Sequence, residues 1–88
     1  AATGAKVLYP GIYGDGRLFI ALDKTINEPG CNQSRVDVVA GHKQINLWLS
    51  IALAAASAKT VNIGTSGCYK GFPTLSEDEN TYLYFNGN

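Results

Sequence analysis

Hydrophobic and polar residues alternate over the first part of the chain, which is the pattern of strands that bury one face. Residues 5–13 are rich in β-branched and aromatic residues, and residues 17–25 carry their leucines and isoleucine at every second position. The glycines on either side of Asp15 can supply a turn between the two segments. We therefore expect a β-hairpin. Pro10 donates no ladder hydrogen bond, so its strand should lie at a sheet edge or contain a bulge.

Three further strands are expected later in the chain, at residues 34–40, 60–65 and 81–86, and residues 69–80 read as irregular. In the first of these strands, one face carries Val36, Val38 and Ala40, and the other carries Arg35, Asp37 and Val39. With the helix described next, the predicted order is β-β-β-α-β-β, an α+β fold.

Residues 42–58 have apolar positions at helical spacing, and their alanine-rich second half has high helix propensity. No charged residue lies between Lys43 and Lys59, so apolar side chains cover nearly the whole circumference. A helix on one sheet of a small monomer should show a polar face to water, so a second surface is expected to cover this one. The stretch is too short to span a membrane. Either the domain encloses the helix, or the helix packs against other copies of the chain. The predicted oligomer interface is Leu47, Ile51, Ala54 and Ala55.

Cysteine usage and the start of the chain both favour export. Cys31 and Cys68 are the only cysteines, and neither lies in a CxxC motif or a Cys/His cluster. A disulfide between them is the simplest interpretation, and two buried free thiols are the alternative. The chain starts with small residues and contains no methionine, as it would after removal of a signal peptide. We expect a secreted protein.

Length and charge narrow the class of protein. Residues 1–88 should form a single domain, because two halves would each be too small to bury a core. Hydrophobic residues make up 45% of the chain and charged residues only 16%, so burial should be generous. Seven lysines and arginines balance seven aspartates and glutamates without a basic run, which argues against nucleic acid as a partner.

Candidate chemistry points to binding rather than catalysis, and we expect no enzyme, no cofactor and no metal. His42 is the only histidine and is expected to cap the helix or to face solvent. The acidic residues 77–79 are expected to form a solvated loop rather than a calcium site. Aromatic rings near small polar groups suggest a lectin-like site, because rings stack on sugars while polar groups bind hydroxyls; the alternative is that the rings complete the core. The predicted ligand-binding residues are Ser66, Tyr69, Phe72, Tyr82 and Tyr84.

A resemblance rests on residues 47–54 (LWLSIALA), residues 59–63 (KTVNI) and the pair Gly67-Cys68. These segments resemble small exported bacterial proteins with a hydrophobic helix followed by a short strand and a cysteine. The strand order and the disulfide also resemble the B subunits of AB toxins of the subtilase-cytotoxin and pertussis-like class. This resemblance implies a five-stranded antiparallel OB-like barrel with one central hydrophobic helix. It also implies a pentameric ring with the helices lining its centre, glycan binding, and a toxin A chain as a possible partner.

Together these observations predict a secreted binding module that self-associates and binds a glycan or another cell-surface ligand. The alternative is a non-enzymatic interaction or inhibitor protein whose apolar helix docks to another protein chain.

Overall fold

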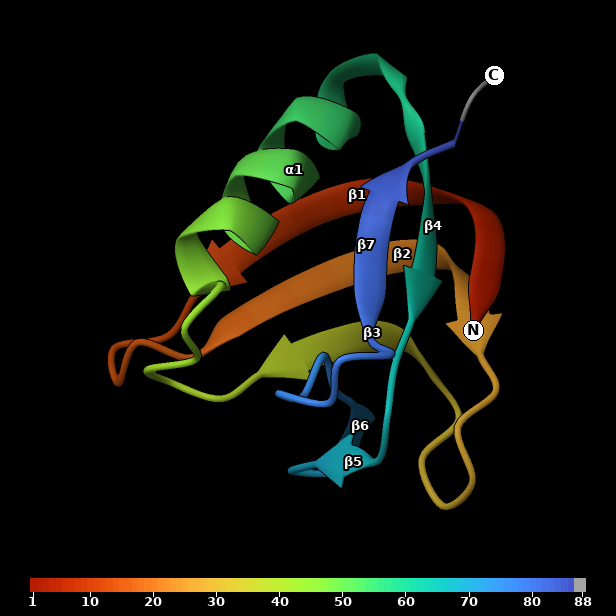
Figure 1. Ribbon diagram of the computed structural model, residues 1–88. Coiled ribbons are helices and arrows are strands. Elements are labelled where there is room, and N and C mark those ends of the chain that lie inside the picture. The colour runs from red at the N-terminus through yellow and green to blue at the C-terminus, as the bar shows by residue number, and fades with distance from the viewer. Residues whose placement is uncertain (87–88) are drawn as a thin grey trace.

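The computed structural model describes residues 1–86 and shows a small α+β domain with one helix and a five-stranded antiparallel sheet (Figure 1). In chain order the elements are β1 (Ala2–Ile12), β2 (Leu18–Ile26), β3 (Gln33–Val38), α1 (Ile45–Ala58), β4 (Thr60–Gly64), β5 (Cys68–Tyr69), β6 (Phe72–Pro73) and β7 (Tyr82–Phe85). The predicted hairpin, third strand, helix and last two long strands are all present within a few residues of their expected bounds.

The long first strand organises the sheet, whose order is β3-β2-β1-β4-β7. The second half of β1 pairs with β2, and its first half pairs with β4. A register shift lies between Val7 and Tyr9, and another lies between Ala2 and Ala5. Such bulges bend a strand, and the bend allows β1 to pair with β4 along its first half and with β2 along its second half. Pro10 was expected at an edge or near a bulge, and the bulge between Val7 and Tyr9 lies just before it; β1 is a central strand, but its pairing with β4 ends at Lys6, so at Pro10 it pairs with β2 alone.

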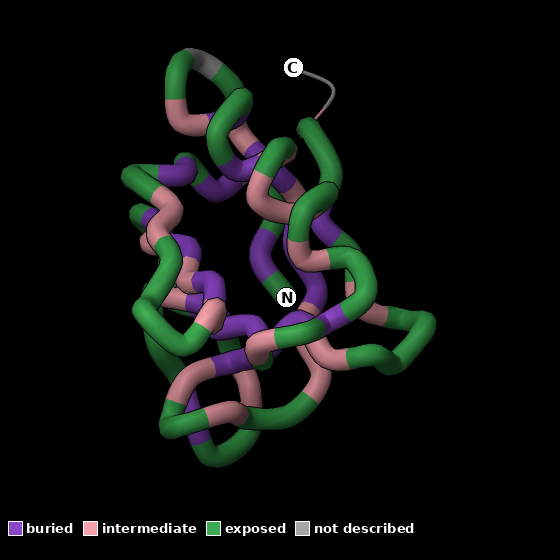
Figure 2. Tube along the Cα trace, turned by 90° about the vertical axis from the view of Figure 1, so that its left-hand side faces the viewer, coloured by how far each residue is buried: buried purple, intermediate pink, exposed green. Residues whose placement is uncertain are grey.

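The core forms where the inner faces of the strands meet the helix (Figure 2). The alternation predicted for β2 and β3 is confirmed, because Leu18, Ile20, Val36 and Val38 are all fully buried. The other buried residues of the same core cluster are Ala2, Ala5, Val7, Leu22, Ile26, Ala52, Ala55, Val61, Ile63, Leu75 and Leu83. Burial of these aliphatic side chains is the main favourable term in the stability of the domain.

The helix begins later than the spacing suggested, at Ile45 rather than near residue 42. Residues 41–44 form turns in which the Ile45 amide donates to the carbonyl oxygen of His42 at 3.1 Å. On the inner face of α1, Ala52 and Ala55 are buried, and these small side chains let the helix approach the sheet closely. Ala55 was predicted at an oligomer interface, but its side chain lies in the core of its own protomer.

The two cysteines form the predicted disulfide, with their Cα atoms 6.1 Å apart. The bond ties the connection between β2 and β3 to the start of β5. In the chain-entropy picture, a crosslink closing a loop of this length stabilises a fold by about 3.5–4 kcal/mol. None of the helices within residues 1–86 is long and apolar enough to cross a membrane.

A short hairpin was missed in the segment expected to be irregular. Strands β5 and β6 pair antiparallel, with Tyr69 opposite Phe72. Lys70 and Gly71 form the turn between them, and both have positive φ angles, of 55° and 85°. A two-residue turn of this kind fits the twist of a hairpin. Each strand has only two residues, which is too short for an alternating pattern to be visible in the sequence.

Candidate functional site

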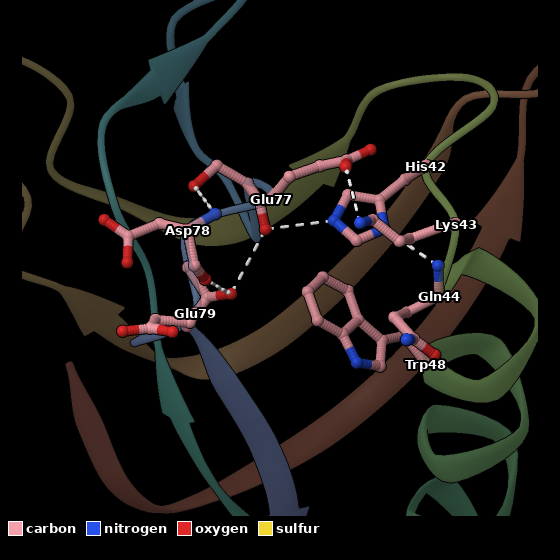
Figure 3. A pocket seen from close by; sticks show the side chains of 9 residues that line it. His42, Lys43, Gln44, Trp48, Glu77, Asp78 and Glu79 are labelled. Carbon is pink, nitrogen blue, oxygen red and sulfur yellow. Dashed lines mark hydrogen bonds and ion pairs between the residues drawn. The ribbon is translucent and has the colours of Figure 1, made fainter.

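A pocket of about 340 Å³ opens between the start of α1 and the loop that leads from β6 to β7 (Figure 3). One wall comes from the turn before the helix and from its first turn, and the other comes from the loop. The lining residues are His42, Lys43, Gln44, Trp48, Ser76, Glu77, Asp78, Glu79 and Thr81.

His42 fixes both walls of this pocket and is only 4% exposed, where the sequence had suggested a cap or an exposed side chain. Its Nδ1 atom accepts a hydrogen bond from the Gln44 amide at 3.0 Å, in the turn just before the first helical residue, Ile45. Nε2 must then carry the ring hydrogen, and it donates to the carbonyl oxygen of Ser76 at 2.9 Å. The imidazole also stacks on the Trp48 ring, with the centroids 4.6 Å apart. One buried side chain therefore positions the helix start, the loop and the indole.

The acidic wall is organised by its own hydrogen bonds. The Asp78 carboxylate accepts from the Asn80 amide at 2.8 Å and from the Ser66 hydroxyl at 3.3 Å. The Thr81 hydroxyl donates to the carbonyl oxygen of Asp78 at 2.8 Å. The loop is therefore shaped before any ligand arrives, which lowers the entropic cost of binding. Ser66, one of the predicted ligand-binding residues, contributes by holding Asp78.

The electrostatics of the pocket are negative. Lys43 contributes one positive charge and lies 3.5 Å from the carboxylate of Glu77 in an exposed ion pair. Asp78 and Glu79 add two further carboxylates. The described residues contain no group of three or more His, Cys, Asp or Glu side chains placed to hold a metal ion. The available chemistry is hydrogen bonding from amide, hydroxyl and carboxylate groups beside an aromatic ring.

The four predicted aromatic residues lie outside this pocket, in two separate pairs. Tyr69 and Phe72 are cross-strand partners in the short hairpin. On β7, the Tyr82 and Tyr84 rings lie 5.4 Å apart and are both exposed. Tyr82 also covers Gly64 on the neighbouring strand, where an added Cβ would come within 2.1 Å of its ring. Part of the Tyr82 ring therefore serves the packing of β4 against β7.

Phe72 belongs to a second cluster that sequence reasoning missed. The Arg35 guanidinium lies over the Phe72 ring at 4.4 Å and over the Phe19 ring at 4.6 Å. Its Nε donates to the Asp37 carboxylate at 2.8 Å, and Arg17 Nε lies 3.3 Å from the same carboxylate. Asp37 was expected on the outer face of β3, and it does lie opposite the buried valines. It is nevertheless fully buried, because the two arginines and β6 cover it.

Tyr13 completes that cluster at the turn between β1 and β2. Its hydroxyl accepts a hydrogen bond from Arg35 Nη2, and this contact lowers the pKa of Tyr13. The hydrogen bond from Arg35 to Asp37 raises the pKa of Arg35 in turn. Arg17 stacks on the Tyr13 ring at 3.9 Å. The only hint of this cluster in the sequence was a charged Arg35/Asp37 pair on one face of a strand.

Of the remaining predicted interface residues, Leu47 and Ala54 lie on the outer face of α1, and Ile51 packs partly against the core. Leu47 and Leu53 are 61% and 56% exposed, Ala54 is exposed, and Ile51 is half-buried. The domain therefore covers one side of the helix, where Ala52 and Ala55 are buried, and leaves Leu47 and Leu53 exposed on the other, so the helix is not enclosed by its own protomer.

The comparisons with known proteins add no relative. The chain matches no protein-family model, and searches of curated proteins and of solved structures find no significant similarity. The geometry of the pocket, the aromatic pairs and the helix face is thus the basis for a functional proposal.

Proposed function

We propose that this protein is an exported, non-enzymatic binding module that holds a saccharide in the pocket between α1 and the β6–β7 loop. The observation that carries the proposal is the half-buried Trp48 ring inside a polar pocket of about 340 Å³. That volume is at the small end of the range of ligand sites and suits one sugar unit. The Trp48 ring packs against the core on one side, and its remaining surface lines the pocket, where it is open to a ligand.

The side chains around Trp48 match the needs of a sugar. Saccharides present an apolar C–H face that stacks on an aromatic ring, together with hydroxyls that both donate and accept hydrogen bonds. Asp78 and Glu79 supply acceptors, Gln44 supplies both a donor and an acceptor, and Lys43 supplies donors. The contacts of His42 and Asp78 hold both walls in place, so little order has to be imposed on binding.

Export is supported by the disulfide between Cys31 and Cys68, because such bonds persist in oxidising compartments. Two features support a toxin-B-subunit-like barrel of the OB type: the strand order, and the pairing of β1 with both β2 and β4. The OB fold is a partly open five-stranded barrel that commonly binds oligosaccharides. In this proposal the sheet is an open variant of that barrel, and a separate toxin A chain would carry any activity.

Fluorescence of the single tryptophan tests the saccharide proposal directly, because Trp48 is the only tryptophan in the chain. Titration with a panel of monosaccharides and short oligosaccharides should shift or quench the emission for at least one of them. A glycan array then compares Gln44→Ala with Tyr84→Ala, which removes an exposed ring outside the pocket. Loss of binding in the first variant alone supports the pocket. Loss in the second alone favours the aromatic pair on β7, and no binding to any saccharide refutes the proposal.

A second candidate function, self-association or docking of another chain through α1, is favoured by the chemistry of its outer face. Leu47, Ile51 and Ala54 follow the i, i+4, i+7 spacing of one helix stripe. The hydroxyls of Ser50 and Ser57 donate back to carbonyl oxygens of the helix at 2.9 and 2.8 Å, so they offer little to water. Such a face suits close packing against an equivalent helix in a ring of identical subunits.

Light scattering at micromolar concentration tests this second candidate. A ring should give a mass several times that of one chain, and Leu47→Asp should convert it to monomer. Thr25→Asp introduces the same charge on an exposed position of β2 and should leave the mass unchanged. If the wild-type protein remains monomeric, self-association through α1 is refuted. The interaction-protein alternative, in which α1 docks to a different chain, would then be the remaining role for this helix face.

A further inference from the structure

We propose that the pocket selects saccharides that carry a protonated amino group over their neutral and N-acetylated counterparts. This inference rests on the proposed saccharide site and names the class of sugar that fits it. Three features carry it: the excess of negative charge on the pocket wall, the indole ring, and the absence within residues 1–86 of a cation paired with Asp78 or Glu79.

The pocket wall contains more negative charge than its own lysine can neutralise. The single ion pair that the described pocket residues make joins Lys43 to Glu77. The Asp78 carboxylate accepts only from neutral donors, the Asn80 amide and the Ser66 hydroxyl. Glu79 makes no ion pair within residues 1–86 either. The Asp78 and Glu79 carboxylates at the pocket therefore have no cationic partner in this part of the chain. A ligand that brings a positive charge would gain an interaction that a neutral sugar cannot make.

The other charges that face the pocket do not cancel this excess. His42 Nδ1 accepts a hydrogen bond from the Gln44 amide, so in this arrangement its ring has a single hydrogen, on Nε2, and adds no cation to the pocket wall. The start of α1 contributes a partial positive charge of about half a unit, which opposes a cation. Two uncompensated carboxylates outweigh that half charge, so the pocket remains attractive to an ammonium group.

The Trp48 ring adds a second attraction for the same group. The face of an indole carries negative potential, and among aromatic side chains tryptophan binds cations best. His42 stacks against Trp48 and fixes its position. Figure 3 shows the acidic loop across the pocket from Trp48, which lies below His42; the Asp78 and Glu79 carboxylates are turned toward the outer rim of the pocket, and Glu77 extends toward Lys43. An amino group would therefore meet Asp78 or Glu79 at the exposed rim of the pocket while the sugar ring stacks on Trp48.

Tryptophan fluorescence titrations with glucosamine, glucose and N-acetylglucosamine test the inference. The titrations are run at about pH 6, where an ordinary amino group is protonated. We expect glucosamine to bind about fivefold more tightly than either of the other sugars, since a partly exposed ion pair contributes up to about that factor. Glu79→Gln should reduce this preference, and Lys43→Gln, which removes the neutralising lysine, should increase it.

Asp23→Asn is the matched control, because it removes one negative charge from an exposed position of β2 outside the pocket. It should leave the preference for glucosamine unchanged. The inference is overturned if the three sugars bind equally. It is also overturned if Glu79→Gln and Asp23→Asn lose the preference for glucosamine to the same extent. In both cases the saccharide proposal stands. Binding of none of the three would overturn the inference, and failure across the wider panel would overturn the saccharide proposal.

Discussion

Replacement of Asp37 by asparagine tests how the buried charge on β3 stabilises the domain. Asp37 is fully buried, and it accepts hydrogen bonds from Arg35 at 2.8 and 3.2 Å. Arg17 lies 3.3 Å from the same carboxylate. Asparagine keeps the shape of the side chain but replaces one oxygen with an amide nitrogen. That nitrogen would face a guanidinium, donor against donor, and two positive charges would lose their common partner.

The expected loss follows from the burial of the three groups. Removing one partner of a buried ion pair typically costs about 3–5 kcal/mol. The arginine side chains keep 14% and 25% of their surface exposed, so water offsets part of that cost. We therefore expect the free energy of unfolding to fall by about 2–3 kcal/mol, a large share of the roughly 5–15 kcal/mol typical of a small domain.

Urea denaturation followed by tryptophan fluorescence measures this change. Asp23→Asn serves as the control, because Asp23 is exposed and asparagine can still accept from the Lys6 amide. The control should change the stability by about 0.5 kcal/mol or less. Arg35→Met in the Asp37→Asn background should recover part of the loss, since it removes one uncompensated charge. An Asp37→Asn protein as stable as the control would refute the reasoning.

Three other predictions follow from the structure. Reduction of the disulfide should lower the free energy of unfolding by about 3.5–4 kcal/mol, which urea denaturation with and without reductant would measure. A loss below about 1 kcal/mol would contradict the chain-entropy argument. The pKa of Tyr13 is lowered by its hydrogen bond with Arg35, so the folded state gains stability as pH rises towards the ordinary tyrosine value. Phenolate absorbance should then lose its earliest transition in Tyr13→Phe, and persistence of that transition would exclude the assignment. His42→Ala should destabilise the domain by about 1–3 kcal/mol and shift tryptophan emission to the red, because the Gln44 amide loses its acceptor and the Ser76 carbonyl oxygen loses its donor. Unchanged emission would contradict the role of the imidazole.

Local patterns predicted most of the fold. The β1–β2 hairpin, β3, α1 and the last long strands follow from period-2 and period-3.6 spacing, which depends only on neighbours in sequence. The same holds for the inward face of β3, where Val36 and Val38 are buried. The disulfide was predictable because Cys31 and Cys68 are the only cysteines and match no metal-binding spacing.

Other features escaped prediction because partners distant in sequence determine them. Asp37 is buried although it lies on the outer face of β3, because Arg17 and Arg35 cover it. The β5–β6 hairpin has too few residues to show a period. The aromatic residues near the end of the chain were close in sequence, but the fold separates the Tyr82/Tyr84 pair from the other two rings.

The sequence by itself determined the class of fold, the positions of its main elements, the crosslink and the unusual lack of charge on the helix, because each of these depends on residue type and spacing along the chain. Only the tertiary structure decided where the pocket lies, since residues 42–48 and 76–81 meet through the hydrogen bond from His42 to Ser76. It also decided how much of the helix is covered, because burial depends on which strands lie beneath α1, and spacing in the sequence does not specify this.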